Sequence, residues 1–115
     1  MSDELKVDIE KINTATAIIH LVGDVTTFAE KALKDAYYTC DHQCENIIFD
    51  FRENDYINSA GIAILISVVT EARKRQQRLL IAVPSVHFQK IFHMVGLQQY
   101  TDIYSTLQEA TNSLN

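Results

Sequence analysis

A serine at the edge of an apolar segment is the position in this sequence with the most evident chemistry. Residues 55–65 read DYINSAGIAIL, and Ser59 lies where the polar part of this segment gives way to the apolar part. Side-chain oxygens at such a boundary accept hydrogen bonds from the free backbone amides of a helix start, so either Asn58 or Ser59 is expected to cap a helix. The same amides, with the positive end of the helix dipole, would stabilise a phosphate on Ser59. Ser59 is therefore predicted to be a structural cap or a phosphorylation site.

Phosphorylation of Ser59 would alter the surface charge without requiring the domain to refold. Phosphoserine carries about −1.5 to −2 charges at neutral pH. The polar segment before Ser59 is already acidic, so the added charge would make it strongly negative. Such a change can switch the binding of a complementary partner protein.

The sequence argues against an enzyme. A serine nucleophile elbow has a glycine two positions before the serine, and that position is Ile57 here. The three glycines are isolated from one another, which excludes a glycine-rich loop for phosphates. No sequence pattern places a histidine near Ser59 as a catalytic base. His20 lies in an apolar segment, and His87 and His93 lie in a predicted helix. We therefore expect a protein with no catalytic activity and no cofactor.

Two groups of residues have side chains that metal ions use. Cys40, His42 and Cys44 lie close together, but zinc generally takes four ligands, so a helix-end turn with incidental cysteines is favoured. A second group could meet at the carboxyl ends of parallel strands and hold magnesium, although solvated loop residues are favoured: Asp24, Asp50, Glu53 and Asp55. No metal site is predicted.

The composition is that of a single folded domain over residues 1–115. The chain is 47% hydrophobic and 22% charged, and its formal net charge is −5. This balance supports a packed core and argues against a nucleic-acid or anionic-membrane surface, while protein partners remain compatible with it. The one basic cluster follows a predicted helix, where positive charge stabilises the helix dipole, and is interpreted as a solvated cap: Arg73, Lys74, Arg75 and Arg78.

The sequence predicts a cytoplasmic protein with reduced thiols. The opening residues, MSDELKVDIE, lack the basic and apolar regions of a signal peptide. No apolar run approaches the roughly 20 residues that cross a bilayer. Two cysteines are too few for a disulfide framework.

Hydrophobic periodicity predicts an alternation of strands and helices. Leu5, Val7 and Ile9 alternate with charged residues, as in a strand with one wet face, and residues 15–23 form a more buried strand paired with it in a hairpin. Thr27 and Glu30 have the spacing of a capping box, and apolar residues recur at helical intervals after it: Phe28, Ala32, Leu33, Ala36, Tyr37 and Cys40. Residues 46–51 suit a strand covered on both faces.

The second half continues this alternation. After a polar loop over residues 52–58, a helix is expected to begin at Ala60 and to be followed by a strand over residues 79–83. The apolar side of this helix should comprise Ile62, Leu65, Ile66, Val69 and Ala72, with Leu65, Ile66 and Val69 buried against the sheet. Ser85 is expected to cap a third helix that stops at Gly96, with Leu97 folding back onto its last turn. The residues that this helix should bury are Phe88, Ile91, Phe92 and Val95. An edge strand is expected around Ile103 and Tyr104, and Ser105 opens the final helix.

These elements define an α/β fold with the order ββαβαβαβα. Alternating strands and helices imply right-handed crossovers and a mainly parallel sheet. The predicted sheet is mixed and five-stranded, with four helices and with the first strand antiparallel at one edge.

Three segments carry a resemblance to a known family. Residues 47–65, IIFDFRENDYINSAGIAIL, are similar to a family segment in which an apolar strand ending in Asp precedes a loop, an aromatic residue and Asp-Ser-Ser/Thr-Gly-Leu. Gly23-Asp24-Val25 resembles the family's Gly-Glu/Asp-Leu turn, and residues 88–97, FQKIFHMVGL, resemble its apolar helix ending in Gly-Leu. Over nearly its whole length the chain resembles a STAS domain, specifically the bacterial anti-sigma factor antagonists.

The resemblance implies a partner-switching role. Ser59 falls on the family's phosphoacceptor serine and Gly61 on its motif glycine. The implied partner is an anti-sigma factor that is also a serine kinase of the histidine-kinase-like ATPase type. Unphosphorylated antagonist binds this partner and frees a sigma factor, phosphorylation ends binding, and a serine phosphatase resets the cycle. The expected partner-binding residues are Asp24, Thr26, Tyr56, Asn58, Ser59 and Ile62, on a protein that is monomeric when free.

The sequence departs from the family pattern near the phosphoacceptor. Asn58 replaces the usual Asp and thereby removes a carboxylate beside the phosphate, Ala60 replaces Ser or Thr, and Glu53-Asn54 replaces a Gly-apolar pair. The alternative function is a non-phosphorylated STAS interaction scaffold, or a small-ligand sensor with its pocket at the strand ends. Attachment to a transporter is not expected.

Overall fold

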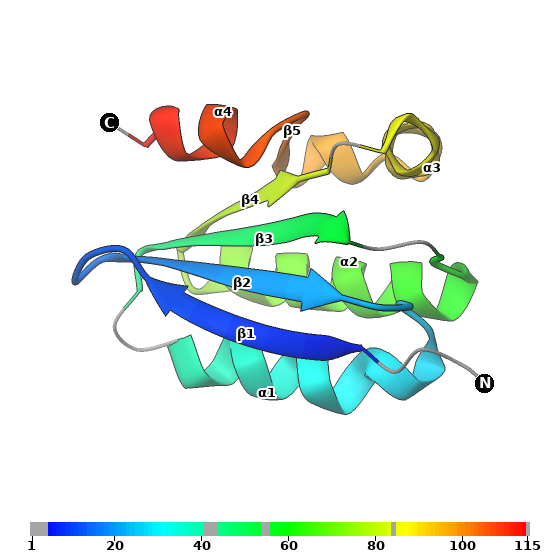
Figure 1. Cartoon of the computed structure of the whole chain (residues 1–115), viewed down its shortest axis with the longest axis horizontal. Coiled ribbons are helices and arrows are strands. Elements are labelled where there is room, and N and C mark those ends of the chain that lie inside the picture. The colour runs from blue at the N-terminus through cyan, green and yellow to red at the C-terminus, as the bar shows by residue number, and fades with distance from the viewer. Residues whose placement is uncertain (1–4, 41–43, 54–55, 84, 115) are drawn as a thin grey trace.

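The chain folds into a mixed sheet with helices on both faces (Figure 1). The computed structural model describes residues 5–40, 44–53, 56–83 and 85–114. In chain order its elements are β1 (Lys6–Lys11), β2 (Thr16–Val22), the 3₁₀ turn η1 (Thr27–Ala29), α1 (Glu30–Cys40), β3 (Asn46–Glu53), α2 (Ser59–Lys74), β4 (Arg78–Ala82), α3 (Val86–Met94), the 3₁₀ turn η2 (Leu97–Gln99), β5 (Asp102–Tyr104) and α4 (Leu107–Asn112). The predicted order ββαβαβαβα is confirmed.

The five strands lie in the sheet in their chain order, β1-β2-β3-β4-β5. β1 pairs with β2 antiparallel, and the other neighbouring strands are parallel. The predicted hairpin and mainly parallel sheet are therefore confirmed. Because β2 and β3 are parallel, the loops that follow them, toward α1 and α2, leave the sheet at the same end (Figure 1).

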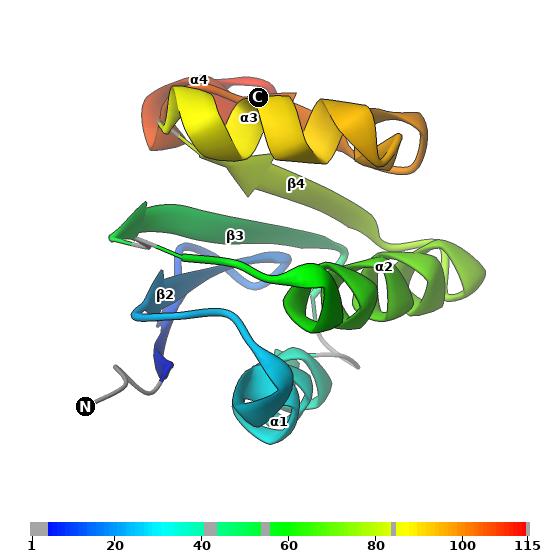
Figure 2. The same ribbon diagram turned by 90° about the vertical axis from the view of Figure 1, so that its right-hand side faces the viewer.

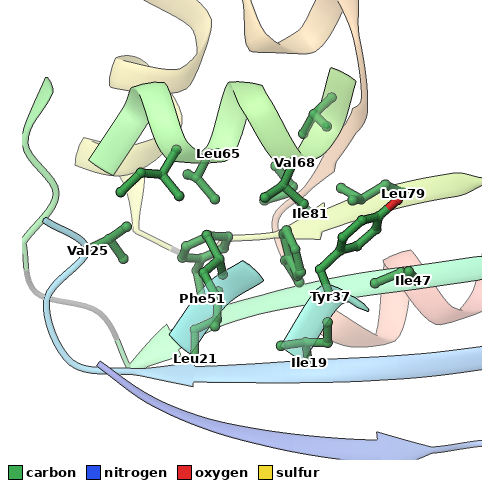
Figure 3. Packing of buried hydrophobic residues seen from close by; sticks show 14 of the residues in the cluster. Ile19, Leu21, Val25, Tyr37, Ile47, Phe51, Leu65, Val68, Leu79 and Ile81 are labelled. Atoms are coloured by element: carbon green, nitrogen blue, oxygen red, sulfur yellow. The ribbon is translucent and has the colours of Figure 1, made fainter. Parts of the chain in front are cut away.

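Two apolar cores pack on the two faces of the sheet. The larger core joins the sheet to α1, α2 and α3, and the smaller one joins it to α4. In Figure 2, α1 and α2 lie side by side on one face of the strands. Figure 3 shows Leu65 and Val68 of α2 pointing toward Phe51 and Ile81 of the strands. This packing fixes α2, and with it the position of Ser59, against the sheet.

The predicted apolar faces are mostly confirmed, with three errors. In α2, Ile66 was expected to be buried but is half-buried, whereas Ile64 and Val68 are buried. Phe28 is 87% exposed, because it lies in the 3₁₀ turn before α1 and is out of phase with that helix. Val95 is 41% exposed, because α3 ends at Met94 and Val95 lies beyond its last turn. The predicted stop at Gly96 is confirmed by its left-handed φ of 77°, and Leu97 is buried behind it.

Three helix caps can be compared with the predictions. The Ser85 hydroxyl accepts a hydrogen bond from the Phe88 amide, as predicted. The other two caps differ from the predictions by one residue. In both cases a second residue with a side-chain hydroxyl stands next to the predicted cap. Thr26 caps the turn before α1 in place of Thr27, and Thr106 caps α4 in place of Ser105.

Candidate functional site

Two loops are joined at the carboxyl ends of β2 and β3. The Val25 amide donates a hydrogen bond to the Tyr56 carbonyl at 2.9 Å, and the Asn58 amide donates to the Val25 carbonyl at 3.3 Å. Val25 and Ile57 also form a parallel bridge, and both side chains are buried. These bonds hold the residues on either side of Val25 next to the segment that leads into α2.

Asn58 caps α2 and leaves Ser59 as the first helical residue. The Asn58 side-chain oxygen accepts a hydrogen bond from the Gly61 amide at 2.9 Å, and its carbonyl accepts one from the Ile62 amide at 2.9 Å. Of the two caps that the sequence allowed, Asn58 is thus the one in use. Ser59 is exposed, and none of the described residues forms a hydrogen bond with its hydroxyl. The hydroxyl is open to modification.

Gly61 lies where α2 meets the loop after β2. A Cβ at this position would overlap the Val25 carbonyl oxygen and lie 2.7 Å from the carbonyl carbon. These distances are too short for any side chain, so only glycine lets the helix start this close to Val25. The glycine expected from the family pattern therefore has a packing reason in this chain.

The other predicted partner-binding residues surround the joined loops. Tyr56 is 51% exposed, whereas Asp24, Thr26 and Ile62 are half-buried. The Thr26 hydroxyl is engaged in capping, since it accepts a hydrogen bond from the Phe28 amide at 3.3 Å. The structure thus places all six predicted residues on or beside two joined loops.

Phe28 is the residue at this end of the molecule that the sequence prediction missed. Its helical spacing suggested a core position, but the 3₁₀ turn directs it into solvent. A large aromatic side chain at this exposure is a common anchor for a protein partner. The consecutive threonines before it, which favour a separate capped turn, were the available signal.

A shallow groove runs from this region between α1 and α2. Its volume is about 320 Å³, and small side chains of α2 form one wall. The residues lining it are Thr27, Glu30, Lys34, Ala60, Ala63, Ile64 and Ser67. Since Ala60 follows Ser59 directly, the groove extends the exposed surface around the serine.

Of the four acidic residues that could have met at the strand ends, Asp24 and Asp50 are described with their side chains, and neither belongs to a described group that could hold a metal ion. Asp50 is buried, and its Oδ2 lies 2.6 Å from His20 Nδ1. The other ring nitrogen of His20 lies 2.9 Å from Glu10 Oε1. Asp55 lies outside the described residues, as does the side chain of Glu53. Asp50 therefore belongs to an ionic network within the sheet.

This network makes the stability of the domain depend on the charge of His20. Burial alone would lower the pKa of His20, but hydrogen bonds and charges from Glu10 and Asp50 outweigh it and raise the pKa above 6.5. The protonated form is therefore favoured by folding, and its contribution is fully present below pH 6.5 and lost as the pH rises through the raised pKa.

We expect urea unfolding to show a larger free energy of unfolding at pH 6 than at pH 8. In His20→Gln the difference between the two pH values should be smaller than in the original protein. The reason is that glutamine cannot gain a proton between the two carboxylates. His87→Gln, at an exposed position of α3, is the control and should keep the pH dependence of the original protein. A pH dependence unchanged by His20→Gln would contradict the role of the network.

The two cysteines belong to the core. Cys40 and Cys44 are both buried with free thiols, and burial together with the neighbouring Cys44 raises the pKa of Cys40 to about 11. Cys40 is therefore a neutral thiol at neutral pH and packs as a small apolar side chain. Within the described residues no three side chains are grouped to hold a metal ion, and His42 lies outside those residues.

Comparison with known proteins identifies the family. The profile of the STAS domain matches residues 6–110. Among solved structures, an anti-sigma factor antagonist from Mycobacterium paratuberculosis is 19% identical with a TM-score of 0.78, covering 98% of this chain and 97% of that one. The phosphorylated Bacillus cell fate determinant SpoIIAA is 20% identical with a TM-score of 0.73, covering 96% and 100%.

The same fold also occurs in another setting. A sulfate transporter family protein from Wolinella succinogenes is 15% identical with a TM-score of 0.77, covering 88% of this chain and 85% of that one. No curated protein sequence matched significantly. Among the described residues, no helix is long and apolar enough to cross a membrane.

The mixed five-stranded sheet with helices on both faces defines the class of small α/β domains to which this chain belongs. The chain belongs to the STAS domain family, as the match over residues 6–110 establishes. Its fold is that of the anti-sigma factor antagonists among these solved structures.

Proposed function

We propose that this protein is an anti-sigma factor antagonist whose partner binding is switched by phosphorylation of Ser59. The observation that carries the proposal is the placement of Ser59, which is exposed at the first position of α2 while Asn58 provides the cap. The hydroxyl can therefore accept a phosphate without loss of a structural hydrogen bond. The partner is a cytoplasmic anti-sigma factor that also acts as a serine kinase, and a serine phosphatase restores the unmodified form.

The binding surface comprises the two joined loops and the start of α2. Its rigid part is the Val25 bridge to the second loop, which fixes the relative positions of Asp24, Thr26 and Ser59. Phe28 and Tyr56 supply exposed aromatic area beside the serine. A partner that packs over these groups must remove water from the Ser59 side chain, whether it carries a hydroxyl or a phosphate.

Phosphate at this position would oppose binding while leaving the fold intact. The free amides and the dipole at the start of α2 stabilise a negative group, so the domain tolerates it. In the complex, however, about two negative charges would be buried at the centre of the contact without a counter-charge. Asn58 in place of a carboxylate lowers the negative charge beside the site, so the phosphate is the main electrostatic change.

The test begins with incubation of the protein with its kinase partner and ATP, followed by mass analysis for a phosphate on Ser59. Four forms are then titrated against the same partner: the unmodified protein, the phosphorylated protein, Ser59→Ala and Ser59→Asp. We expect a single phosphate on the original protein and none on Ser59→Ala. Unmodified protein and Ser59→Ala should bind with similar affinity, whereas the phosphorylated form should lose at least about tenfold, or 1.4 kcal/mol. Ser59→Asp should fall between them, because aspartate has less charge and fewer oxygens than phosphoserine.

Circular dichroism of all four forms is the control for folding. Equal affinity of the phosphorylated and unmodified proteins, with folding preserved, would remove the switch. Absence of phosphorylation by any cognate kinase would favour the alternative, a STAS scaffold or small-ligand sensor that is not phosphorylated. The presence of Asn58 where the family has a carboxylate is the observation that keeps this alternative open.

A further inference from the structure

A second charged surface lies at the opposite end of the molecule from Ser59. Four of the ten lysines and arginines fall within positions 73–78, although the chain as a whole carries a net charge of −5. They lie where α2 ends and β4 begins, whereas Ser59 starts α2. The helix separates the two ends by about 24 Å, from its 16 residues, and Figure 1 shows them at opposite ends of the sheet.

The positive charge of this cluster is only partly neutralised within the chain. Arg75 pairs with Glu71 at 2.9 Å, and Arg78 approaches Asp102 no closer than 3.8 Å. In the part of the chain that the structure describes, no carboxylate lies within ion-pair distance of Arg73 or Lys74. The surface therefore presents an excess of positive charge.

The helix dipole accounts for only part of this arrangement. Arg73 and Lys74 lie in the last turn of α2, where cations are favourable, but Arg78 is the first residue of β4. Arg73 and Arg78 line the same hollow of about 270 Å³, which continues over polar side chains of the segment before β5. The hollow thus has two guanidinium groups that come from different elements.

Both guanidinium groups are held in position by the rest of the chain. Arg73 lies over the Tyr100 ring, 5.5 Å from its centroid, and donates a hydrogen bond to the Gln99 carbonyl at 3.4 Å. Arg78 donates to the Ser113 carbonyl at 3.4 Å. Such restraint lowers the conformational entropy lost when a ligand binds.

We propose that this hollow docks an acidic polypeptide segment of a second partner protein. Guanidinium groups match carboxylates in pairs of parallel hydrogen bonds, so Arg73 and Arg78 would receive acidic side chains. The Gln98 amide and the Asp102 carboxylate, which line the same hollow, suit the amide groups of a peptide main chain. Asp102 would repel the continuous phosphates of a nucleic acid, whereas a polypeptide can place a main-chain amide against it and its carboxylates against the two arginines.

Because the hollow and Ser59 lie at opposite ends of α2, both surfaces can be occupied together. The inference does not depend on phosphorylation of Ser59 or on the identity of the first partner. A domain with two such surfaces would bring a partner at the serine end together with an acidic protein at the other end.

The proposal is tested with a short fluorescent peptide of alternating glutamate and serine, titrated at low ionic strength and followed by anisotropy and amide chemical shifts. We expect shifts at residues 98–102 and a loss of affinity of about fivefold or more in Arg73→Gln/Arg78→Gln. The matched control is Lys31→Gln/Lys90→Gln, which removes the same charge from exposed positions of α1 and α3. It should change affinity by less than about twofold.

Three results would overturn the proposal. The first is equal loss of affinity in the two double variants, which would indicate non-specific attraction. The second is no binding of the peptide by the original protein at low ionic strength. The third is tighter binding of an oligothymidylate of the same charge, which would indicate a nucleic-acid surface.

Discussion

Replacing Leu65 with alanine is expected to lower the free energy of unfolding by about 2–5 kcal/mol. Leu65 is fully buried in the larger core and points from α2 toward the sheet (Figure 3). Alanine removes three carbon atoms from this site, so the loss includes both the transfer of apolar surface from water and the cavity that remains. Urea unfolding followed by circular dichroism measures the change.

The neighbouring Ile66 is the matched control. It lies on the same helix but is only half-buried, so Ile66→Ala should cost clearly less than Leu65→Ala. Equal costs at the two positions, or a cost below about 0.5 kcal/mol at Leu65, would mean that α2 presents a different face to the sheet.

The fold could be predicted because its elements are fixed by local patterns. Three patterns predicted their elements directly. Alternating apolar residues predicted the half-exposed strand β1, continuous apolar runs predicted the buried strands β3 and β4, and Gly96 predicted the end of α3. The errors in the helix caps arose where two neighbouring residues offer the same chemistry. Thr26 and Thr27 can both cap a helix, and their spacing does not distinguish them. In the structure the cap is Thr26, which directly follows the residue that hydrogen bonds join to the loop before α2.

The candidate site could be predicted only in part. Ser59 and Gly61 are marked by a local motif, and the structure places them at the start of α2 as that motif implies. The pairing of His20 with Asp50 could not be predicted, because it depends on the register of β2 against β3. The exposure of Phe28 was missed for a similar reason, since it depends on a short turn whose geometry the spacing of apolar residues does not reveal.

Gly61→Ala should be more destabilising than any other single methyl addition at the start of α2. In an ordinary helix this change is favourable by about 1 kcal/mol. Here the added Cβ would overlap the Val25 carbonyl oxygen, which belongs to backbone and cannot rotate away. We expect overpacking to dominate, with a net loss of about 1–3 kcal/mol.

The same change should also reduce binding of the proposed kinase partner, because relief of the overlap moves Ser59 away from the loop that carries Thr26. The Val25 carbonyl accepts the hydrogen bond of the Asn58 amide, so a shift of α2 disturbs both the cap and the bridge between the loops. Ala63→Gly, at an exposed position of the same helix, is the control. It should cost about 1 kcal/mol through helix propensity alone, and it serves as the control for stability. If propensity governed both positions, Gly61→Ala would stabilise the protein, and that result would refute the close approach of α2 to Val25.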